Sequence, residues 1–160
     1  MTLAAPQVRD ALLQQRALIS TAVLPPTCSM YQPGLAHVTL HARRGDVMTH
    51  EKKVHRRVPD DYYRQLLSRV HRVLTGHQVE HALHIFSEGV ESDFVDVTAG
   101  LPSVRLHLNG NDFAAWHCLG RDDLLLTSGS GVYSLTAAFF ASVMLHPESF
   151  RAGLVDQGGP

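Results

Sequence analysis

The sequence lacks an excess of charge of either sign, because its 160 residues include 14 Lys and Arg against 15 Asp and Glu. A chain without a strong positive field has no electrostatic footprint for nucleic acid, so nucleic acid is excluded as an expected partner. Any site for an anion must therefore be local, built from a few basic side chains that lie together.

Cysteine is scarce: the chain has Cys28 and Cys118, and no CxxC pair. Two cysteines are too few for a disulfide framework, so we expect a reducing compartment. Histidine is abundant, with 11 residues, but no HExxH motif occurs. His37 and His41, four residues apart on an extended strand, would lie ~13 Å from each other, too far to share a metal. No metal site and no cofactor are predicted.

No segment indicates secretion or membrane insertion. The N-terminus has no basic region followed by a long apolar core, so a signal peptide is not predicted. A long uncharged stretch at 124–145 is interrupted by SGSG at 128–131, and each part is too short to span a bilayer. A buried strand, a turn and a buried helix explain the same residues.

The chain divides into two parts by its pattern. Residues 1–34 contain an amphipathic helix at 7–19 and a proline-containing connector, whereas residues 35–160 alternate between strand-like and helix-like segments. Strand patterns occur at 35–42, 81–87, 103–108 and 123–128, helical patterns at 58–75, 91–97, 112–119 and 132–145, and a polar loop is expected at 46–57.

Strands that alternate with helices are typical of parallel βαβ units. The sequence therefore predicts an α/β fold, a Rossmann-like open and mostly parallel sheet with helices on both faces. Ligands of such sheets bind beyond the carboxyl ends of the strands. The predicted strands end in RRGD at 43–46, SEG at 87–89, NG at 109–110 and SGSG at 128–131, so these four turns are expected to lie along one edge.

The end of the first predicted strand carries two arginines and an aspartate. Arg43 shares a face with His41 and can offer a planar fork of donors to a phosphate. Asp46 can accept from a sugar hydroxyl, a guanine edge or an arginine. Gly45 permits a positive φ and a close approach of the ligand to the backbone. Arg44 points to the other face, where it either contacts the ligand or pairs with Asp46 and fixes the loop.

The end of the fourth predicted strand is a serine-glycine turn that opens a helix, with Ser128 and Ser130 in it. Exposed backbone N–H groups and the helix dipole make such a turn an anion site. Facing Arg43 on the neighbouring strand, the turn would form a cradle for pyrophosphate. The chain has neither GxxxxGK[ST] nor GxGxxG, so a Walker-type nucleotidase and a standard NAD site are disfavoured.

These motifs resemble a known family. HARRGD at 41–46 matches H-x-R-R-x-D, the signature of the fucosyltransferases that make α-1,2 and α-1,6 linkages and of the protein O-fucosyltransferases. The stretches VPDDYYRQLL, HIFSEG, VRLHLNG and DDLLLTSGSGVYSLTAAFF are similar to the segments that follow in that family, so the resemblance covers about residues 35–145.

The resemblance implies roles for particular residues. Arg43 would bind the β-phosphate of GDP-fucose and be needed for activity, and His41 would help to hold the nucleotide. Asn109, where the family often has an aspartate, would contact guanine, and Ser128 and Ser130 would contact phosphate. The implied reaction transfers L-fucose to a hydroxyl of a glycan or protein with inversion and without a metal, and the implied compartment is the secretory pathway.

The family's enzymes have two Rossmann-like domains, the GT-B arrangement, and the resemblance covers the C-terminal, donor-binding one. An N-terminal acceptor-binding domain is thus expected as a partner that these 160 residues do not contain. Asp46 and Glu88 are candidates for the general base by position. The alternatives are a non-catalytic module that binds a nucleotide or a glycan, and an unrelated phosphate-binding α/β domain.

Overall fold

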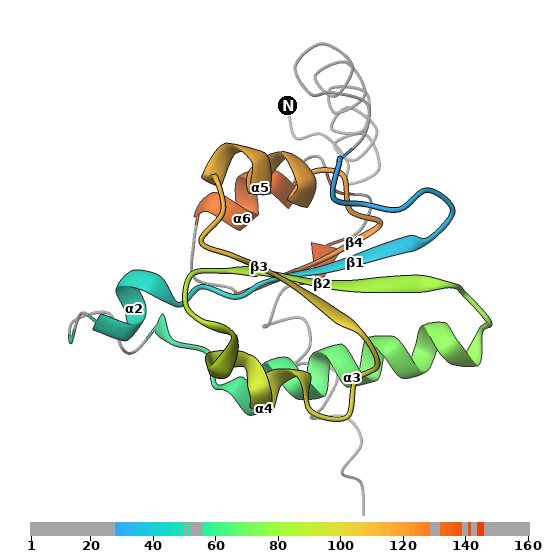
Figure 1. Ribbon diagram of the computed structural model, residues 1–160, viewed down its shortest axis with the longest axis horizontal. Helices are drawn as coiled ribbons and strands as arrows, with labels where there is room; N and C mark the ends of the chain where they lie inside the picture. The colour runs from blue at the N-terminus through green and yellow to red at the C-terminus, as the bar shows by residue number, and fades with distance from the viewer. Residues whose placement is uncertain are drawn as a thin grey trace, which may run out of the picture.

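The computed structural model describes residues 28–49, 51, 56–128, 132–138, 141 and 144–145. Within them, five parallel strands form one sheet in the order β3-β2-β1-β4-β5 (Figure 1). The strands are β1 (Ala36–His41), β2 (His81–Ser87), β3 (Val104–Leu108), β4 (Leu124–Thr127) and β5 (Met144–Leu145). The helix predicted at 7–19 lies outside the described residues.

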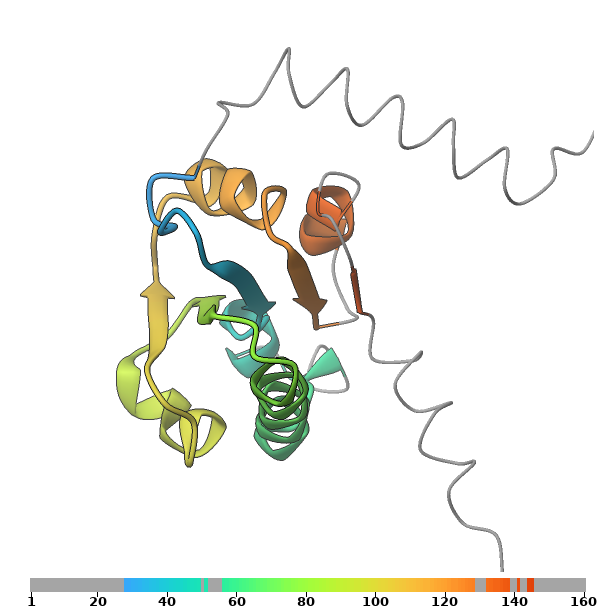
Figure 2. The same cartoon turned by 90° about the vertical axis from the view of Figure 1, so that its right-hand side faces the viewer.

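Helices cover both faces of the sheet, as Figure 2 shows from the side. The faces are covered by α3 (Asp60–Gly76) with the short η2 (Glu91–Phe94) and α4 (Val95–Thr98) on one side, and by α5 (Asp112–Leu119) with α6 (Val132–Ala138) on the other. The predicted α/β class, a Rossmann-like open parallel sheet, is confirmed. None of the helices in the described ranges has the length and apolar character needed to cross a bilayer.

The side-chain alternation of the strands creates a separate core on each face. Val38 and Leu40 of β1 are buried against α3, in a cluster that includes Leu66 and Leu67. On the other face, Leu125 of β4 is buried in a second cluster with residues of α5 and α6. Helices shield both faces, but only the face toward α3 is uniformly apolar in β1, since His37 and Thr39 of β1 and His84 of β2 are buried on the other face.

Two segments differ from the sequence prediction. The polar loop expected at 46–57 begins with a helix, α2 (Gly45–Thr49), because Val47 is fully buried and anchors the turn. The helix expected at 132–145 ends at Ala138 where it is described, and residues 144–145 are strand β5. Pairing with the exposed edge of β4, where Leu125 lies opposite Met144, outweighs the local helical pattern.

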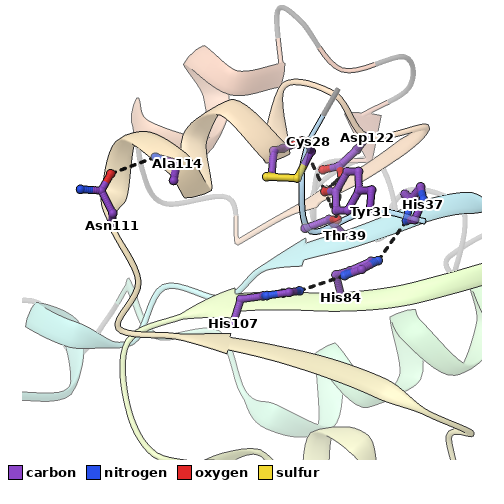
Figure 3. The surroundings of a disulfide bond; sticks show 10 residues. Cys28, Tyr31, His37, Thr39, His84, His107, Asn111, Ala114 and Asp122 are labelled. Atoms are coloured by element: carbon purple, nitrogen blue, oxygen red, sulfur yellow. Dashed lines mark hydrogen bonds between the residues drawn. A yellow bond between two sulfur atoms is a disulfide. The ribbon is translucent and has the colours of Figure 1, made fainter. Parts of the chain in front are cut away.

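A disulfide joins Cys28, which precedes β1, to Cys118 in α5 (Figure 3). Both residues are buried, and the bond spans 90 positions of the chain. This single bond argues against the expected reducing compartment, because such bonds persist where the surroundings are oxidising. The sequence could not show the pairing, since it depends on α5 packing over the start of β1.

Beside the disulfide lies a buried carboxyl group, Asp122. Tyr31 and Thr39 both donate hydrogen bonds to its Oδ1, the latter over 2.7 Å, while its Oδ2 has no partner among the described residues. Burial raises the pKa of Asp122 well above 3.8, although the two hydrogen bonds act in the opposite direction. Between pH 3.8 and its raised folded-state pKa, Asp122 therefore holds a proton in the folded protein that the unfolded chain has released.

Replacing both cysteines, in Cys28→Ser/Cys118→Ser, is expected to lower the free energy of unfolding by about 3–5 kcal/mol, because the open chain gains conformational entropy when unfolded. Urea denaturation under non-reducing conditions measures the difference. Wild type with added reductant is the matched control and should behave like the variant. Equal urea midpoints for oxidised wild type and variant would contradict a structural role for the bond.

Asp122→Asn is expected to flatten the dependence of stability on pH. Because burial raises the folded-state pKa, the stability that protonated Asp122 contributes is complete below about pH 4 and is lost as the pH rises toward the folded pKa. The amide cannot ionise, so the stability of the variant should fall less than that of wild type between pH 4 and pH 8. Urea titrations at several pH values test this. An equally steep loss in both proteins would refute it, and exposed Asp96→Asn is the control.

Candidate functional site

The carboxyl ends of β1, β2 and β3 border a cleft of about 830 Å³. Its walls come from residues 41–44 and 46 at the end of β1 and beyond it, residues 86–88 at the end of β2, residues 106–112 at the end of β3 and beyond it, and parts of α5 and α6. The strand order reverses between β1 and β4, so the cleft adjoins the switch point where such folds bind ligands. The structure thus brings together five of the seven predicted site residues: His41, Arg43, Arg44, Asp46 and Asn109.

Arg43 and Asp46 form a close ion pair at the mouth of this cleft. Arg43 Nη2 donates to Asp46 Oδ2 over 2.7 Å and to Oδ1 over 3.0 Å, and Nε donates to Oδ1 over 3.1 Å. Asp46 lies in the first turn of α2, which places its carboxylate three residues after the arginine. The pair holds the guanidinium plane in one orientation, a requirement for bidentate binding of an anion.

Arg44 points to the opposite face and has a structural environment. Its guanidinium is 7% exposed, donates to Asp60 Oδ1 over 2.7 Å and lies 4.3 Å from the centre of the Phe94 ring. The alternative pairing of Arg44 with Asp46 is therefore wrong: Arg43 makes that pair. Through Asp60 and Phe94, Arg44 ties the loop after β1 to the start of α3 and to η2.

His41, the last residue of β1, faces α6 beside the ring of Tyr133, with 5.2 Å between ring centres. Burial lowers its pKa to about 4, and the neighbouring charge of Arg43 adds to the effect. The imidazole is therefore neutral at pH 7. Its buried Nδ1 has no hydrogen-bond partner among the described residues, so this face of the cleft contains an unsatisfied polar group.

Gly45 serves close packing and not a turn with positive φ. It is the first residue of α2 and is not among the described glycines with positive φ, which contradicts the expected turn. A Cβ at this position would overlap the carboxylate of Glu88, which comes from the end of β2. Glycine thus allows Glu88 to lie against the loop of β1 at the edge of the cleft.

Asn109, directly after β3, adopts φ 51°. Its Nδ2 donates to Gly89 O over 2.7 Å, and its Oδ1 accepts from Gly89 N over 3.0 Å, so the side chain joins the turns after β3 and β2. An aspartate here would lose the donor to Gly89 O, which explains the amide. Asparagine is also one of the few side chains that tolerate a left-handed backbone. Its predicted contact with guanine stays a prediction.

The serine-glycine turn can be placed only at its start. Ser128 follows Thr127, which lies opposite His41 in the pairing of β4 with β1, so the two strand ends are adjacent as predicted. Ser128 is 2% exposed, and its hydroxyl has no partner among the described residues. Ser130 lies outside the described residues, so the predicted phosphate contacts of both serines stay predictions.

Sequence reasoning missed His107, which lines the cleft from β3. It also missed the hydrogen bonds that join His107 to His84 on β2 and His84 to His37 on β1. A sequence pattern that could have indicated the row is a histidine on the same face of each of three strands. Whether these histidines lie next to one another depends on the strand register, which the sequence does not show. In the part of the chain that the structure describes, no group of three His, Cys, Asp or Glu side chains could hold a metal ion.

Arg44→Met is expected to lower the free energy of unfolding by about 2–4 kcal/mol, because it leaves Asp60 without its buried partner. The methionine retains most of the apolar stem, so the loss reports on the charge. Arg64→Met is the matched control: Arg64 pairs with Asp61 on the exposed side of α3, and the urea midpoint should not change. Equal effects of both substitutions would contradict a structural role specific to Arg44.

Comparison with known proteins gives a distant structural likeness. No protein-family model matches the sequence, and no curated protein matches it. Two crystal structures of POFUT1 in complex with GDP are similar to this chain, with TM-scores of 0.44 and 0.40 and 9% sequence identity in both. The similarity covers 85% and 86% of this chain but 47% and 46% of the solved chains. This chain therefore spans less than half the length of those proteins.

Proposed function

We propose that this domain binds a nucleotide sugar, with GDP-fucose as the donor, in the cleft at the carboxyl ends of β1, β2 and β3. It would act as the donor-binding half of an enzyme that transfers L-fucose to a hydroxyl of a glycan or protein. The observation that carries the proposal is the orientation of Arg43 at the mouth of the cleft by Asp46, within HARRGD, next to the end of β4. The resemblance of HARRGD to the fucosyltransferase signature supplies the choice of sugar.

The chemistry supports a diphosphate near β1. When the sugar leaves, the diphosphate gains negative charge, and a fixed guanidinium stabilises this charge more in the transition state than in the ground state. His41 is neutral beside Arg43, because burial holds its pKa near 4, so it adds a polar contact without a competing positive charge. The hydroxyl of Ser128, which has no partner in the described part of the chain, lies on the neighbouring strand end, directly after β4.

Of the two carboxylates considered for the general base, Glu88 fits better. Asp46 accepts three hydrogen bonds from Arg43, and this engagement fixes it as the partner of the arginine. Glu88 is exposed, lines the cleft and comes from the neighbouring strand. A carboxylate at that place could accept the proton of an acceptor hydroxyl that approaches from outside the cleft.

Arg43→Ala is expected to weaken GDP binding at least tenfold, since it removes charge-assisted hydrogen bonds to phosphate. Calorimetric titration with GDP, ADP and FMN measures this, and wild type should prefer GDP. Arg64→Ala, an arginine of α3 whose side chain lies outside the cleft, is the control and should bind GDP as wild type does.

Equal affinity for the three nucleotides, or unchanged GDP binding in Arg43→Ala, would reject the proposal. GDP binding without release of fucose from GDP-fucose would instead favour the alternative, a non-catalytic nucleotide-binding module. That outcome is informative because turnover is expected to need an acceptor-binding half as well as the donor-binding cleft.

A further inference from the structure

Three histidines form a hydrogen-bonded row across the sheet, on the face that α5 covers (Figure 3). His37 Nδ1 lies 3.0 Å from His84 Nε2, and His84 Nδ1 lies 2.9 Å from His107 Nε2. The register explains the contacts: Thr39 lies opposite His84, and Phe86 lies opposite His107, so each histidine is displaced by two residues from the last. The row therefore runs diagonally over β1, β2 and β3, and it ends in the cleft.

One end of the row fixes the direction of every hydrogen bond in it. His37 Nε2 lies 2.7 Å from the carbonyl oxygen of Gln32, and a carbonyl oxygen can only accept. In its neutral form, His37 therefore carries its proton on Nε2 and accepts at Nδ1. His84 then donates from Nε2 and accepts at Nδ1, and His107 in turn donates from Nε2. A neutral row leaves the lone pair of His107 Nδ1 unused.

The anchor of the row is held firmly. The ring of Tyr31 stacks on that of His37 with centres 4.2 Å apart, and its hydroxyl donates to the buried Asp122. Cys28, three residues before Tyr31, is bonded to Cys118 in α5. The segment that presents the Gln32 carbonyl is thus fixed to the sheet by a covalent bond, a ring stack and a buried hydrogen bond.

The other end of the row opens into the cleft. His107 is half-buried, stacks on Phe86 with ring centres 4.3 Å apart, and lines the cleft. Its Nδ1 has no hydrogen-bond partner among the described residues and remains accessible to solvent. Burial, and the charge of Arg105 on the same strand, lower the pKa of His107, while burial with the neighbouring histidines lowers the pKa of His84 to about 3. His84 and His107 are therefore neutral at pH 7.

We infer that His107 Nδ1 is a fixed hydrogen-bond acceptor of the cleft, which binds an N–H or O–H donor of the ligand. Phosphate oxygens are acceptors and find no partner there, whereas Arg43, two strands away, offers donors. The ligand consequently lies with its diphosphate toward β1 and a neutral, donor-bearing part toward β3. The choice of ligand rests on the proposed function. The donor comes either from the nucleoside or from the fucose, and the two sources can be distinguished.

The direction of the row can be tested without a ligand. Nitrogen NMR of the full chain at pH 7 should show His37, His84 and His107 protonated on Nε2. In His37→Phe, which keeps the ring stack on Tyr31, the Gln32 anchor is lost, so His84 can reverse and His107 should gain Nδ1–H. His71→Phe, which removes the separate pair of His71 with His81 outside the cleft, is the control and should leave His107 unchanged. Wild-type His107 protonated on Nδ1 would overturn the inference.

The ligand contact is tested with His107→Phe, which preserves the stack on Phe86 and removes both nitrogens. GDP, guanosine, GDP-fucose and pyrophosphate are titrated into wild type and variant. If the variant binds GDP and guanosine about fivefold more weakly than wild type does, the hydrogen-bond donor belongs to the nucleoside. If only the affinity for GDP-fucose falls by a similar factor, the hydrogen-bond donor belongs to the fucose. Pyrophosphate binding should not change.

Equal binding of all four ligands by wild type and His107→Phe, or a loss with pyrophosphate, would overturn this inference and leave the proposed function intact. A wild-type protein that fails to bind GDP would overturn the proposed function, and with it the ligand assigned to His107. The NMR measurement would still decide the direction of the row. His37→Phe provides an independent check. If the row reverses in this variant, it should bind more weakly the same ligand that His107→Phe binds more weakly.

Discussion

The parallel pairing of β1 with β2 on one side and β4 on the other is the arrangement on which the site depends. It makes β1 the strand where the sheet changes its winding direction, so the helices that follow on the two sides lie on opposite faces. The chain beyond His41 therefore leaves the sheet between the helices of its two faces, α3 and α4 on one face and α5 and α6 on the other. The cleft, the Arg43–Asp46 pair and the unpartnered groups of His41 and Ser128 all lie at that point.

Two adjacent arginines with different environments result from the same strand. Arg43 continues the face of His41 and remains at the cleft, where Asp46 orients it. Arg44 continues the other face and is buried between Asp60 and Phe94. One guanidinium thus lies at the cleft, paired with Asp46, while the other stabilises the loop that carries the first. The double arginine of the motif has a physical explanation in this division.

The sequence predicted most of the fold because strand and helix patterns are local: 81–87 and 112–119 are found with the bounds expected. It failed where long-range contacts decide, as with the Cys28–Cys118 bond and strand β5, which needs the edge of β4. The carboxyl-end rule located the site, but the partners of Arg44 and Asn109 could not be read from spacing. The histidine row depends on strand register, which no single segment encodes.

The disulfide divides the sheet into two mechanically different parts. β1, β2 and β3 lie inside the loop closed by Cys28 and Cys118, whereas β4 and β5 lie outside it. If the chain were pulled by its two ends, tension would pass directly from Cys28 to Cys118. The segment between them, across a sequence separation of 90, would bear no load, and about 300 Å of extended chain would stay unreleased. Stretching would separate β4 from β1, while the three strands that lead into Arg43, Glu88 and Asn109 kept their pairing.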